Sequence, residues 1–125
     1  MKTILIVDDQ KSALHGLKAM FSHIPEFEVI GEATNGRDAV QYAAATLPNI
    51  VLMDVRMPVM DGLLATRHLR KLNLPVAVVL ISVSVDSEAE ALAAGADAFV
   101  SKGEPPEHLL AVLESLDFEE DDELS

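Results

Sequence analysis

The feature that most constrains the fold of this chain is a regular alternation between short apolar runs and longer segments with helical spacing. The apolar runs predict five strands, at residues 3–7, 28–32, 50–53, 76–81 and 96–100. The other segments predict five helices, at residues 11–24, 34–47, 61–72, 87–94 and 105–116. Apolar runs without polar alternation are typical of strands buried on both faces. The pattern therefore predicts an α/β fold with a doubly wound five-stranded parallel sheet and helices on both faces.

Several residues mark where the predicted helices begin and end. Pro25 should end the first helix, because proline cannot continue one. Ser87 and Glu90 have the spacing of a capping box, which predicts that Ser87 caps the fourth helix. Gly95 is the expected end of that helix, and Pro105-Pro106 should open the last one.

The size and charge of the chain restrict its organisation and its partners. The 125 residues fit one domain, and the chain has no cysteine for disulfides or thiolate chemistry. The formal net charge is −12, with six of the acids in residues 117–125. We expect a domain at residues 1–117, then an acidic, disordered tail or the start of a linker at 118–125. An acidic body repels phosphate backbones, so direct nucleic acid binding is not expected.

The first apolar run is short and closely followed by acids. Only four apolar residues precede Asp8, too few for a signal peptide or a membrane span. We therefore expect a cytoplasmic protein without a membrane anchor.

Polar residues follow four of the predicted strands directly. They are Asp8 and Asp9 after the first strand, Asp54 after the third, Ser82 after the fourth and Lys102 after the fifth. Right-handed crossovers place the carboxyl ends of parallel strands at one rim, where ligands bind in open α/β sheets. Taken singly, these are ordinary turn, cap and surface residues. Their joint position predicts one site.

The residue types at this rim indicate phosphoryl chemistry. Three carboxylates close together repel one another unless a cation intervenes, and Mg²⁺ suits oxygen donors of this kind. The Asp54 carboxylate could act as a nucleophile toward phosphorus, giving an aspartyl phosphate. The transferred group carries charge on three oxygens, which an ammonium and a hydroxyl would stabilise. Lys102 and Ser82 would supply these two groups.

The same positions carry a family resemblance. The motifs that carry it are Ile6-Val7-Asp8-Asp9, Met53-Asp54 with Met57-Pro58 and Asp61-Gly62, Ser82, Gly95-Ala96-Asp97-Ala98-Phe99, and Lys102. Over residues 3–116 the chain resembles a receiver domain of a two-component response regulator. Its sequence is most similar to those of receivers attached to LuxR-type helix-turn-helix output domains. The resemblance implies a flavodoxin-like (βα)₅ fold with strand order 2-1-3-4-5.

The resemblance also implies roles for the matched residues. Asp54 would accept a phosphoryl group from a histidine kinase. Asp9, Asp54 and the backbone carbonyl of Arg56 would bind Mg²⁺ directly, with Asp8 acting mainly through a water. Lys102 would contact the phosphoryl group.

A conformational switch is implied as well. The Ser82 hydroxyl would turn to the phosphoryl group while Phe99 moves inward. The face built from residues 87–94, 96–100 and 105–116 would then change, with a homodimer and transcriptional output as consequences. Arg56 and Ser84 would modulate dephosphorylation. The interval from Ser82 to Lys102 is two residues shorter than usual in the family, which leaves Ser84 as an alternative hydroxyl.

Two other functions remain open from the sequence. One is an interaction domain that kept the fold but does not depend on phosphorylation. The other is a Mg²⁺-dependent phosphohydrolase with an aspartyl nucleophile. Such enzymes need a second acid two residues after the nucleophile, where this chain has Arg56. We therefore predict a signalling module and not an enzyme that turns over substrate.

Overall fold

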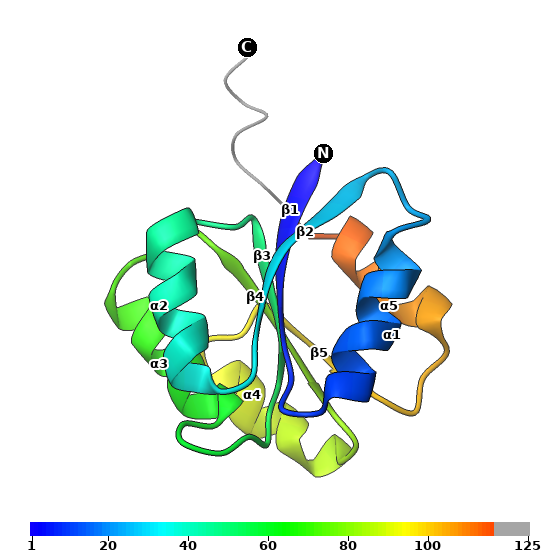
Figure 1. Ribbon diagram of the computed structural model, residues 1–125. Coiled ribbons are helices and arrows are strands. Elements are labelled where there is room, and N and C mark those ends of the chain that lie inside the picture. The colour runs from blue at the N-terminus through cyan, green and yellow to red at the C-terminus, as the bar shows by residue number, and fades with distance from the viewer. Residues whose placement is uncertain (117–125) are drawn as a thin grey trace.

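The computed structural model describes residues 1–116, which fold into one parallel sheet between two layers of helices (Figure 1). The strands are β1 (Lys2–Val7), β2 (Phe27–Ala33), β3 (Ile50–Asp54), β4 (Ala77–Ser82) and β5 (Ala98–Ser101). The helices are α1 (Lys11–Phe21), α2 (Gly36–Thr46), α3 (Gly62–Lys71), α4 (Glu88–Ala94) and α5 (Pro106–Glu114), with a 3₁₀ turn η1 (Val85–Ser87) before α4. The predicted tail at 118–125 lies outside the described residues.

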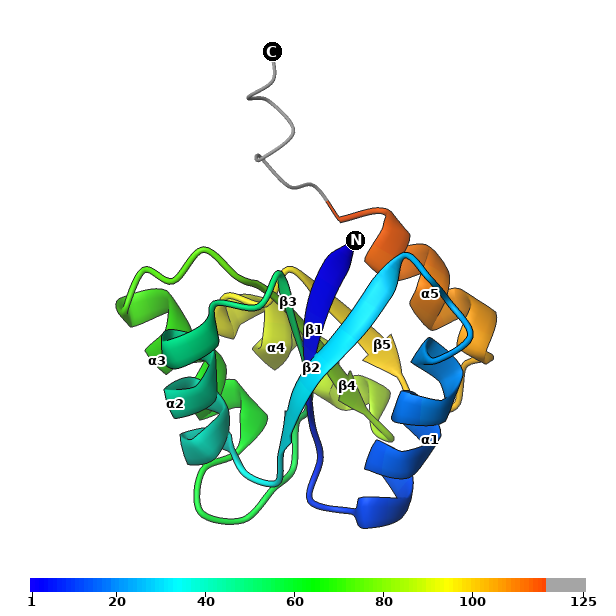
Figure 2. The same cartoon turned by 45° about the horizontal axis from the view of Figure 1, so that its top comes forward.

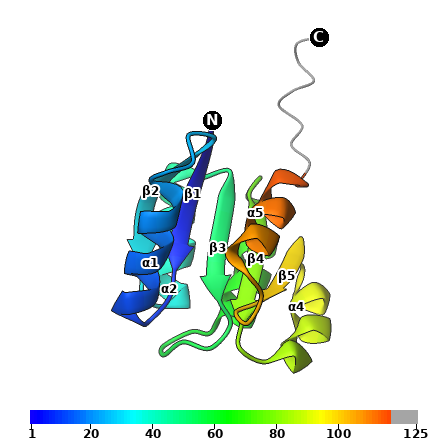
Figure 3. The same cartoon turned by 90° about the vertical axis from the view of Figure 1, so that its right-hand side faces the viewer.

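The strand order β2-β1-β3-β4-β5 confirms the predicted sheet. Every pairing is parallel, so all five strands end at the same rim. Figure 3 shows this rim at the end of the sheet opposite the start of β1. Parallel order with right-handed crossovers thus places the predicted site residues on one edge.

Two apolar cores hold the layers together, one on each face of the sheet. Helices α2, α3 and α4 cover one face, and α1 and α5 cover the other (Figure 2). In β1, Leu5 and Val7 point into the first core while Ile4 and Ile6 point into the second. Burial on both faces explains the unbroken apolar runs of the central strands. Among the described helices, none is long and apolar enough to cross a membrane.

The first helix is shorter than predicted. α1 ends at Phe21, although apolar spacing suggested that it would continue to residue 24. Ser22 and His23 instead form a turn that leads to Pro25. The residue before a proline is disfavoured in the helical region, so Ile24 leaves the helix early.

The predicted capping box at the fourth helix is wrong. Ser87 has helical backbone angles and makes no side-chain cap bond. The local cap is Ser84, whose hydroxyl accepts a hydrogen bond from the backbone N–H of Asp86 at 3.3 Å. Ser87 is buried beneath the helix, and Gly95 ends α4 with a φ of 108°, as predicted.

Candidate functional site

A polar cavity of about 530 Å³ opens at the rim where the strands end. It is lined by residues from the ends of β1, β3, β4 and β5 and from the start of α1: Asp9, Gln10, Ser12, Ala13, Asp54, Arg56, Ser82, Val83 and Lys102. The segments that supply these residues are distant in sequence and meet only because the strands are parallel.

Three carboxylates form the acidic side of this site. Asp8 is fully buried, Asp54 is 8% exposed and Asp9 is exposed. One oxygen from each lies within 4.8 Å of the others. Burial raises the pKa of Asp54, the Lys102 ammonium opposes that rise, and the charges of Asp8 and Asp9 add to it. The ionised cluster is therefore short of positive charge.

Lys102 supplies the positive charge that the structure does contain. Its Nζ donates a hydrogen bond to Oδ2 of Asp8 at 2.9 Å and lies 3.6 Å from Oδ1 of Asp54. Burial lowers the pKa of Lys102, but the hydrogen bond to Asp8 and the charge of Asp54 outweigh it and raise the pKa above its ordinary value. The ammonium thus stays charged between the two buried acids.

The two serines that follow the apolar part of β4 are placed differently. Ser82 is 1% exposed and lines the cavity, and its Oγ accepts a hydrogen bond from the backbone N–H of Ser84 at 3.1 Å. The hydroxyl of Ser84 is engaged in the η1 turn through Asp86. Ser82 is therefore the hydroxyl beside Asp54 and Lys102 in this structure.

The loop after β3 holds Asp54 at the rim through a close backbone approach. The N–H of Gly62 donates to the carbonyl of Val55 at 2.7 Å, which folds the loop back on the strand end. A Cβ on Gly62 would collide with the carbonyl oxygen of Asp54, so this position requires glycine. Asp61 then caps α3 by accepting a hydrogen bond from the N–H of Leu64 at 2.9 Å.

Val59, in the same loop, has a backbone conformation that is rare for its type. Its φ is 69°, in the left-handed region, and its side chain is exposed. A β-branched residue is disfavoured in this region. The loop that positions Asp54 therefore contains local strain.

Of the predicted switch and modulator residues, Ser82 and Arg56 line the cavity and Phe99 and Ser84 do not. Phe99 in β5 is half-buried and packs against the core beneath α4. Arg56 is exposed and lines the cavity, while Ser84 does not line it.

Four cavity residues were not among the sequence-predicted candidates, namely Gln10, Ser12, Ala13 and Val83. The backbone N–H of Gln10 donates to Oδ1 of Asp8 at 2.9 Å, which helps to orient that carboxylate. Val83 follows Ser82 and stands exposed at the cavity edge. In the sequence, the only indication that Gln10 and Val83 belong to the site is that they directly follow Asp9 and Ser82.

The donor set fits a hard divalent cation. Three carboxylates within one small volume offer only oxygen ligands, which Mg²⁺ prefers while it keeps several waters. A bound cation would also offset the repulsion that raises the pKa of Asp54.

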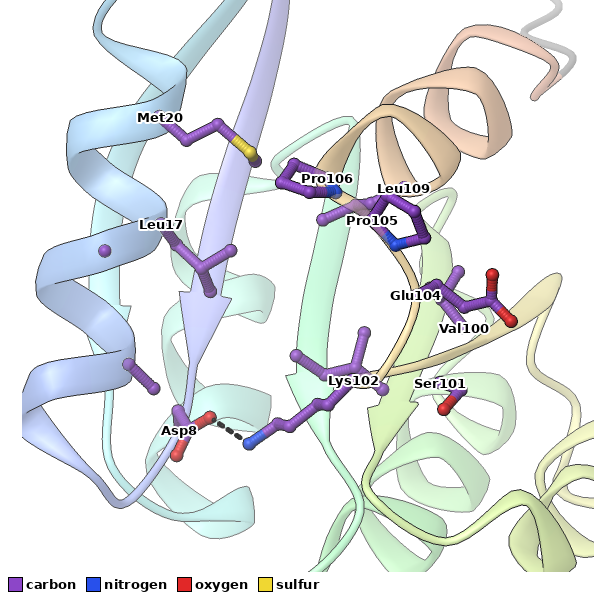
Figure 4. A pocket seen from close by; sticks show the side chains of 13 residues that line it. Asp8, Leu17, Met20, Val100, Ser101, Lys102, Glu104, Pro105, Pro106 and Leu109 are labelled. Atoms are coloured by element: carbon purple, nitrogen blue, oxygen red, sulfur yellow. Dashed lines mark hydrogen bonds and ion pairs between the residues drawn. The ribbon is translucent and has the colours of Figure 1, made fainter.

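A second, apolar cavity of about 300 Å³ adjoins the polar one, between α1 and the start of α5 (Figure 4). Leu17 and Met20 line one wall, and Pro106 and Leu109 line the other. Asp8 and Lys102, joined by the hydrogen bond drawn as a dashed line in Figure 4, also line this cavity.

Comparison with known proteins gives a consistent result. The model of the response regulator receiver domain matches residues 4–114. The nitrate/nitrite response regulator protein NarL of Escherichia coli K12 is 38% identical over 113 residues, which cover 89% of this chain and 52% of NarL. The chain thus spans about half the length of this curated relative.

Solved structures show the same fold. A LuxR-family DNA-binding response regulator from Staphylococcus aureus has a TM-score of 0.85 at 25% identity, covering 91% of this chain and 97% of that one. A CheX–CheY–BeF₃–Mg²⁺ complex from Borrelia burgdorferi has a TM-score of 0.83 at 26% identity, covering 91% of this chain and 87% of that one.

Proposed function

The chain belongs to the response regulator receiver domain family, and from this premise we propose that it is phosphorylated on Asp54 by a histidine kinase with Mg²⁺. The observation that carries the proposal is the position of Asp54. Its carboxylate lies 3.6 Å from the Lys102 ammonium and within 4.8 Å of the oxygens of Asp8 and Asp9. A carboxylate between a cation and two further acids is suited to phosphoryl transfer in the presence of a divalent ion.

The residues of this chain would act together in the transfer. A carboxylate oxygen of Asp54 attacks phosphorus while the bond to the donor breaks. The Lys102 ammonium and the Ser82 hydroxyl stabilise charge on the phosphoryl oxygens. Asp9, Asp54 and the backbone carbonyl of Arg56 would hold Mg²⁺, with Asp8 behind them. The ion would neutralise charge on the carboxylates and the phosphoryl group.

Phosphorylation would change the population of two conformations and not the fold. Ser82 would turn toward the phosphoryl group, and Phe99, which is only half-buried, would move further inward. The surface of α4, β5 and α5 would change with them. Arg56 and Ser84 would modulate dephosphorylation by controlling access of the attacking water.

The proposed output is transcriptional. The sequence resembles those of receivers of LuxR-type regulators, and the similar solved structure from Staphylococcus aureus is a DNA-binding regulator of that family. DNA binding would belong to an output domain outside these residues, because the chain carries a net charge of −12. We place the protein in the cytoplasm and the domain boundary at residue 117.

One observation favours a second candidate function. α4 has only seven residues, and its entry turn binds the Ser82 hydroxyl oxygen through the N–H of Ser84. A domain in which this segment does not respond to Asp54 would be a phosphorylation-independent interaction module. A phosphohydrolase is disfavoured because Arg56 occupies the position where such enzymes need a second acid.

The deciding experiment is incubation with acetyl phosphate and Mg²⁺, followed by mass spectrometry and hydroxylamine treatment. We expect one adduct at Asp54 that hydroxylamine removes, and none in Asp54→Asn. Asp38→Asn, which changes an exposed carboxyl at the start of α2, should be labelled like the unchanged chain. Absence of a hydroxylamine-sensitive adduct would remove the phosphoacceptor proposal, and steady hydrolysis of a phosphomonoester would support the phosphohydrolase.

A second measurement separates the two signalling candidates. Amide NMR shifts of residues 83–99 are followed while BeF₃⁻ and Mg²⁺, the combination present in the Borrelia complex, are added. Shifts throughout this segment support the switch, and unchanged shifts favour the phosphorylation-independent module.

A further inference from the structure

The last turns of α3 carry positive charge in a chain that is acidic overall. The formal net charge is −12, yet residues 62–85, which include α3 and β4, contain no Asp or Glu. They hold three of the nine Lys and Arg residues of the chain, namely Arg67, Arg70 and Lys71. The negative end of the helix dipole favours cations at this position, but it does not supply them with acidic partners.

Two of these three cations have no acidic partner. Arg70 is paired with Asp97 at 2.6 Å. Arg67 and Lys71 are exposed and form no ion pair within residues 1–116. Because they are four residues apart, they are neighbours on one side of the helix. Leu72 follows them and is 53% exposed. We call Arg67, Lys71 and Leu72 the basic end of α3.

The other Lys and Arg residues of the described chain either have partners or lie elsewhere. Four of them make interactions within the structure: Lys2, Lys18, Arg37 and Lys102. Lys11 and Arg56 form no ion pair in residues 1–116, but they lie near the rim where the strands end. Away from that rim, the unpaired Lys and Arg side chains of the described residues are therefore gathered at the basic end of α3.

The acidic residues 117–125 start from the same side of the domain. α5 begins near the rim and runs back, so Leu116, the last described residue, lies on the side where the strands begin (Figure 3). α3 also runs back from the rim, because β3 before it ends there and the parallel strand β4 after it starts on the opposite side. Leu116 and the basic end of α3 therefore lie on one side of the domain, in the two different helix layers (Figure 2).

The length of the acidic segment is sufficient to cross between these layers. Nine residues span up to about 30 Å when extended. The centres of the two helix layers are on the order of 20 Å apart, because each helix is about 10 Å across and the sheet lies between them. The segment can therefore reach the basic end of α3 in its own chain.

We propose that residues 117–125 dock on the basic end of α3 of the same chain. Six of these nine residues are acidic and none is Lys or Arg, so their charge is complementary to that of Arg67 and Lys71. The segment also contains Phe118 and Leu124, which can cover the exposed side chain of Leu72. The covalent connection gives the segment a high effective concentration at this surface, which favours it over a second copy of the chain.

The contact is salt-sensitive and partly occupied, because exposed ion pairs are individually weak. It does not rest on phosphorylation of Asp54, since the cations are exposed and unpaired with Asp54 unmodified. Binding is therefore measured on the whole 125-residue chain without a phosphodonor. The chain has no cysteine, so Ser125→Cys provides a single attachment site for a nitroxide spin label.

We expect the nitroxide to broaden the amide NMR signals of residues 67–73, with the ascorbate-reduced label as the reference. The double variant Arg67→Gln with Lys71→Gln should recover about half or more of the lost signal intensity, because the charged partners of the segment are removed. The matched control is Lys11→Gln with Lys18→Gln, which removes the same charge from α1 and should leave the broadening unchanged. Added NaCl should reduce the broadening in the unchanged chain.

A mixing experiment identifies which chain supplies the segment. Isotope-labelled chain without the nitroxide is combined with spin-labelled chain that carries no isotope label. We expect no broadening in this mixture, since the contact is within one chain. Broadening at residues 67–73 in the mixture would overturn the proposal, because the segment would then bind a second copy.

Three further results would also overturn the proposal: no broadening at residues 67–73, equal recovery in the two double variants, or broadening that NaCl does not change. The dispersion of the amide signals reports whether each variant is folded, and glutamine keeps a high helix propensity in α3 and α1. A failure to phosphorylate Asp54 would leave all of these outcomes unchanged.

Discussion

At the scale of single residues, the carboxyl group of Asp54 lies in surroundings that favour its neutral form. Burial raises its pKa above the ordinary value of 3.8, and Lys102 offsets this only in part. The folded state therefore holds the proton to higher pH than the unfolded state does. As the pH rises from the pKa of Asp54 in the unfolded state through its pKa in the folded state, ionisation of Asp54 lowers the free energy of unfolding.

Replacing Asp54 tests this conclusion. In the presence of EDTA at neutral pH, Asp54→Asn should melt at a higher temperature than the unchanged chain, because no buried carboxylate must ionise. The difference should shrink as the pH is lowered toward 3.8, where the unfolded carboxyl group also binds its proton. Circular dichroism melting curves between pH 4 and 8 would measure it. A difference that does not vary with pH would contradict the argument.

Val59 gives a prediction about strain. Its φ of 69° is unfavourable for a β-branched residue but not for glycine. Val59→Gly should increase the free energy of unfolding by roughly 0.5–1 kcal/mol, since relief of strain exceeds the entropy that glycine gains in the unfolded chain. Urea unfolding would measure the change. Val85→Gly, at an exposed valine without positive φ, should lower the free energy of unfolding instead.

At the scale of elements, Arg70 joins α3 to the segment between α4 and β5. Its guanidinium donates to the carbonyls of Gly95 and Val76, each at 2.8 Å, and to Asp97 Oδ2 at 2.6 Å. The same Asp97 oxygen accepts from the N–H of Val78 at 2.8 Å. One side chain thus connects the end of α3, the start of β4 and the turn before β5.

Removing this guanidinium should have a large and local effect. Arg70→Met keeps much of the side-chain bulk but should lower the free energy of unfolding by about 2 kcal/mol, because two carbonyls and a carboxylate lose their donor. Hydrogen exchange should accelerate first at residues 95–98. Arg37→Met removes only an exposed pair at 3.8 Å and should change stability by less than about 0.5 kcal/mol. Equal effects of the two variants would refute the proposed role.

The elements show what local sequence can and cannot predict. The five strands follow from the apolar runs, their shared rim follows from the crossover rules, and their order is what the family resemblance implies. The meeting of Asp8, Asp54 and Lys102 could therefore be predicted. The cap at the η1 turn that leads into α4 could not be predicted, because Ser84 and Ser87 are both acceptable caps. The choice depends on the burial of Ser87 and on the hydrogen bond to Ser82, which are tertiary facts.

Arg70 escaped prediction for a similar reason. On the α3 sequence it is one polar residue among several, and its partners lie up to 27 residues away. Likewise, helical spacing did not show that Leu92 faces solvent while Ala91 faces the core. The periodicity of apolar residues divides a helix into faces, but tertiary packing determines which face is buried.

At the scale of the whole molecule, the acidic cluster should couple cation binding to folding. A cation that binds only the folded chain stabilises it by about 1.4 kcal/mol at ten times its dissociation constant. For a domain of this size we expect a rise in melting temperature of about 5 °C with Mg²⁺.

Asp9→Asn should remove most of this rise, because it removes one of the three carboxylate donors. Asp86→Asn, at an exposed acid far from the cluster in sequence, should keep it. NaCl of equal ionic strength separates site binding from general screening of the −12 charge. A rise that NaCl reproduces would argue against a specific site.

The direction of α5 has a practical consequence. The helix starts near the carboxylates and runs back, so it ends at the side of the domain where the strands begin (Figure 3). A fluorophore or affinity handle joined behind it would leave the approach to Asp54 unobstructed. For the same reason, a domain fused behind α5 can respond to a change at Asp54 only through a displacement that is transmitted along the length of the strands.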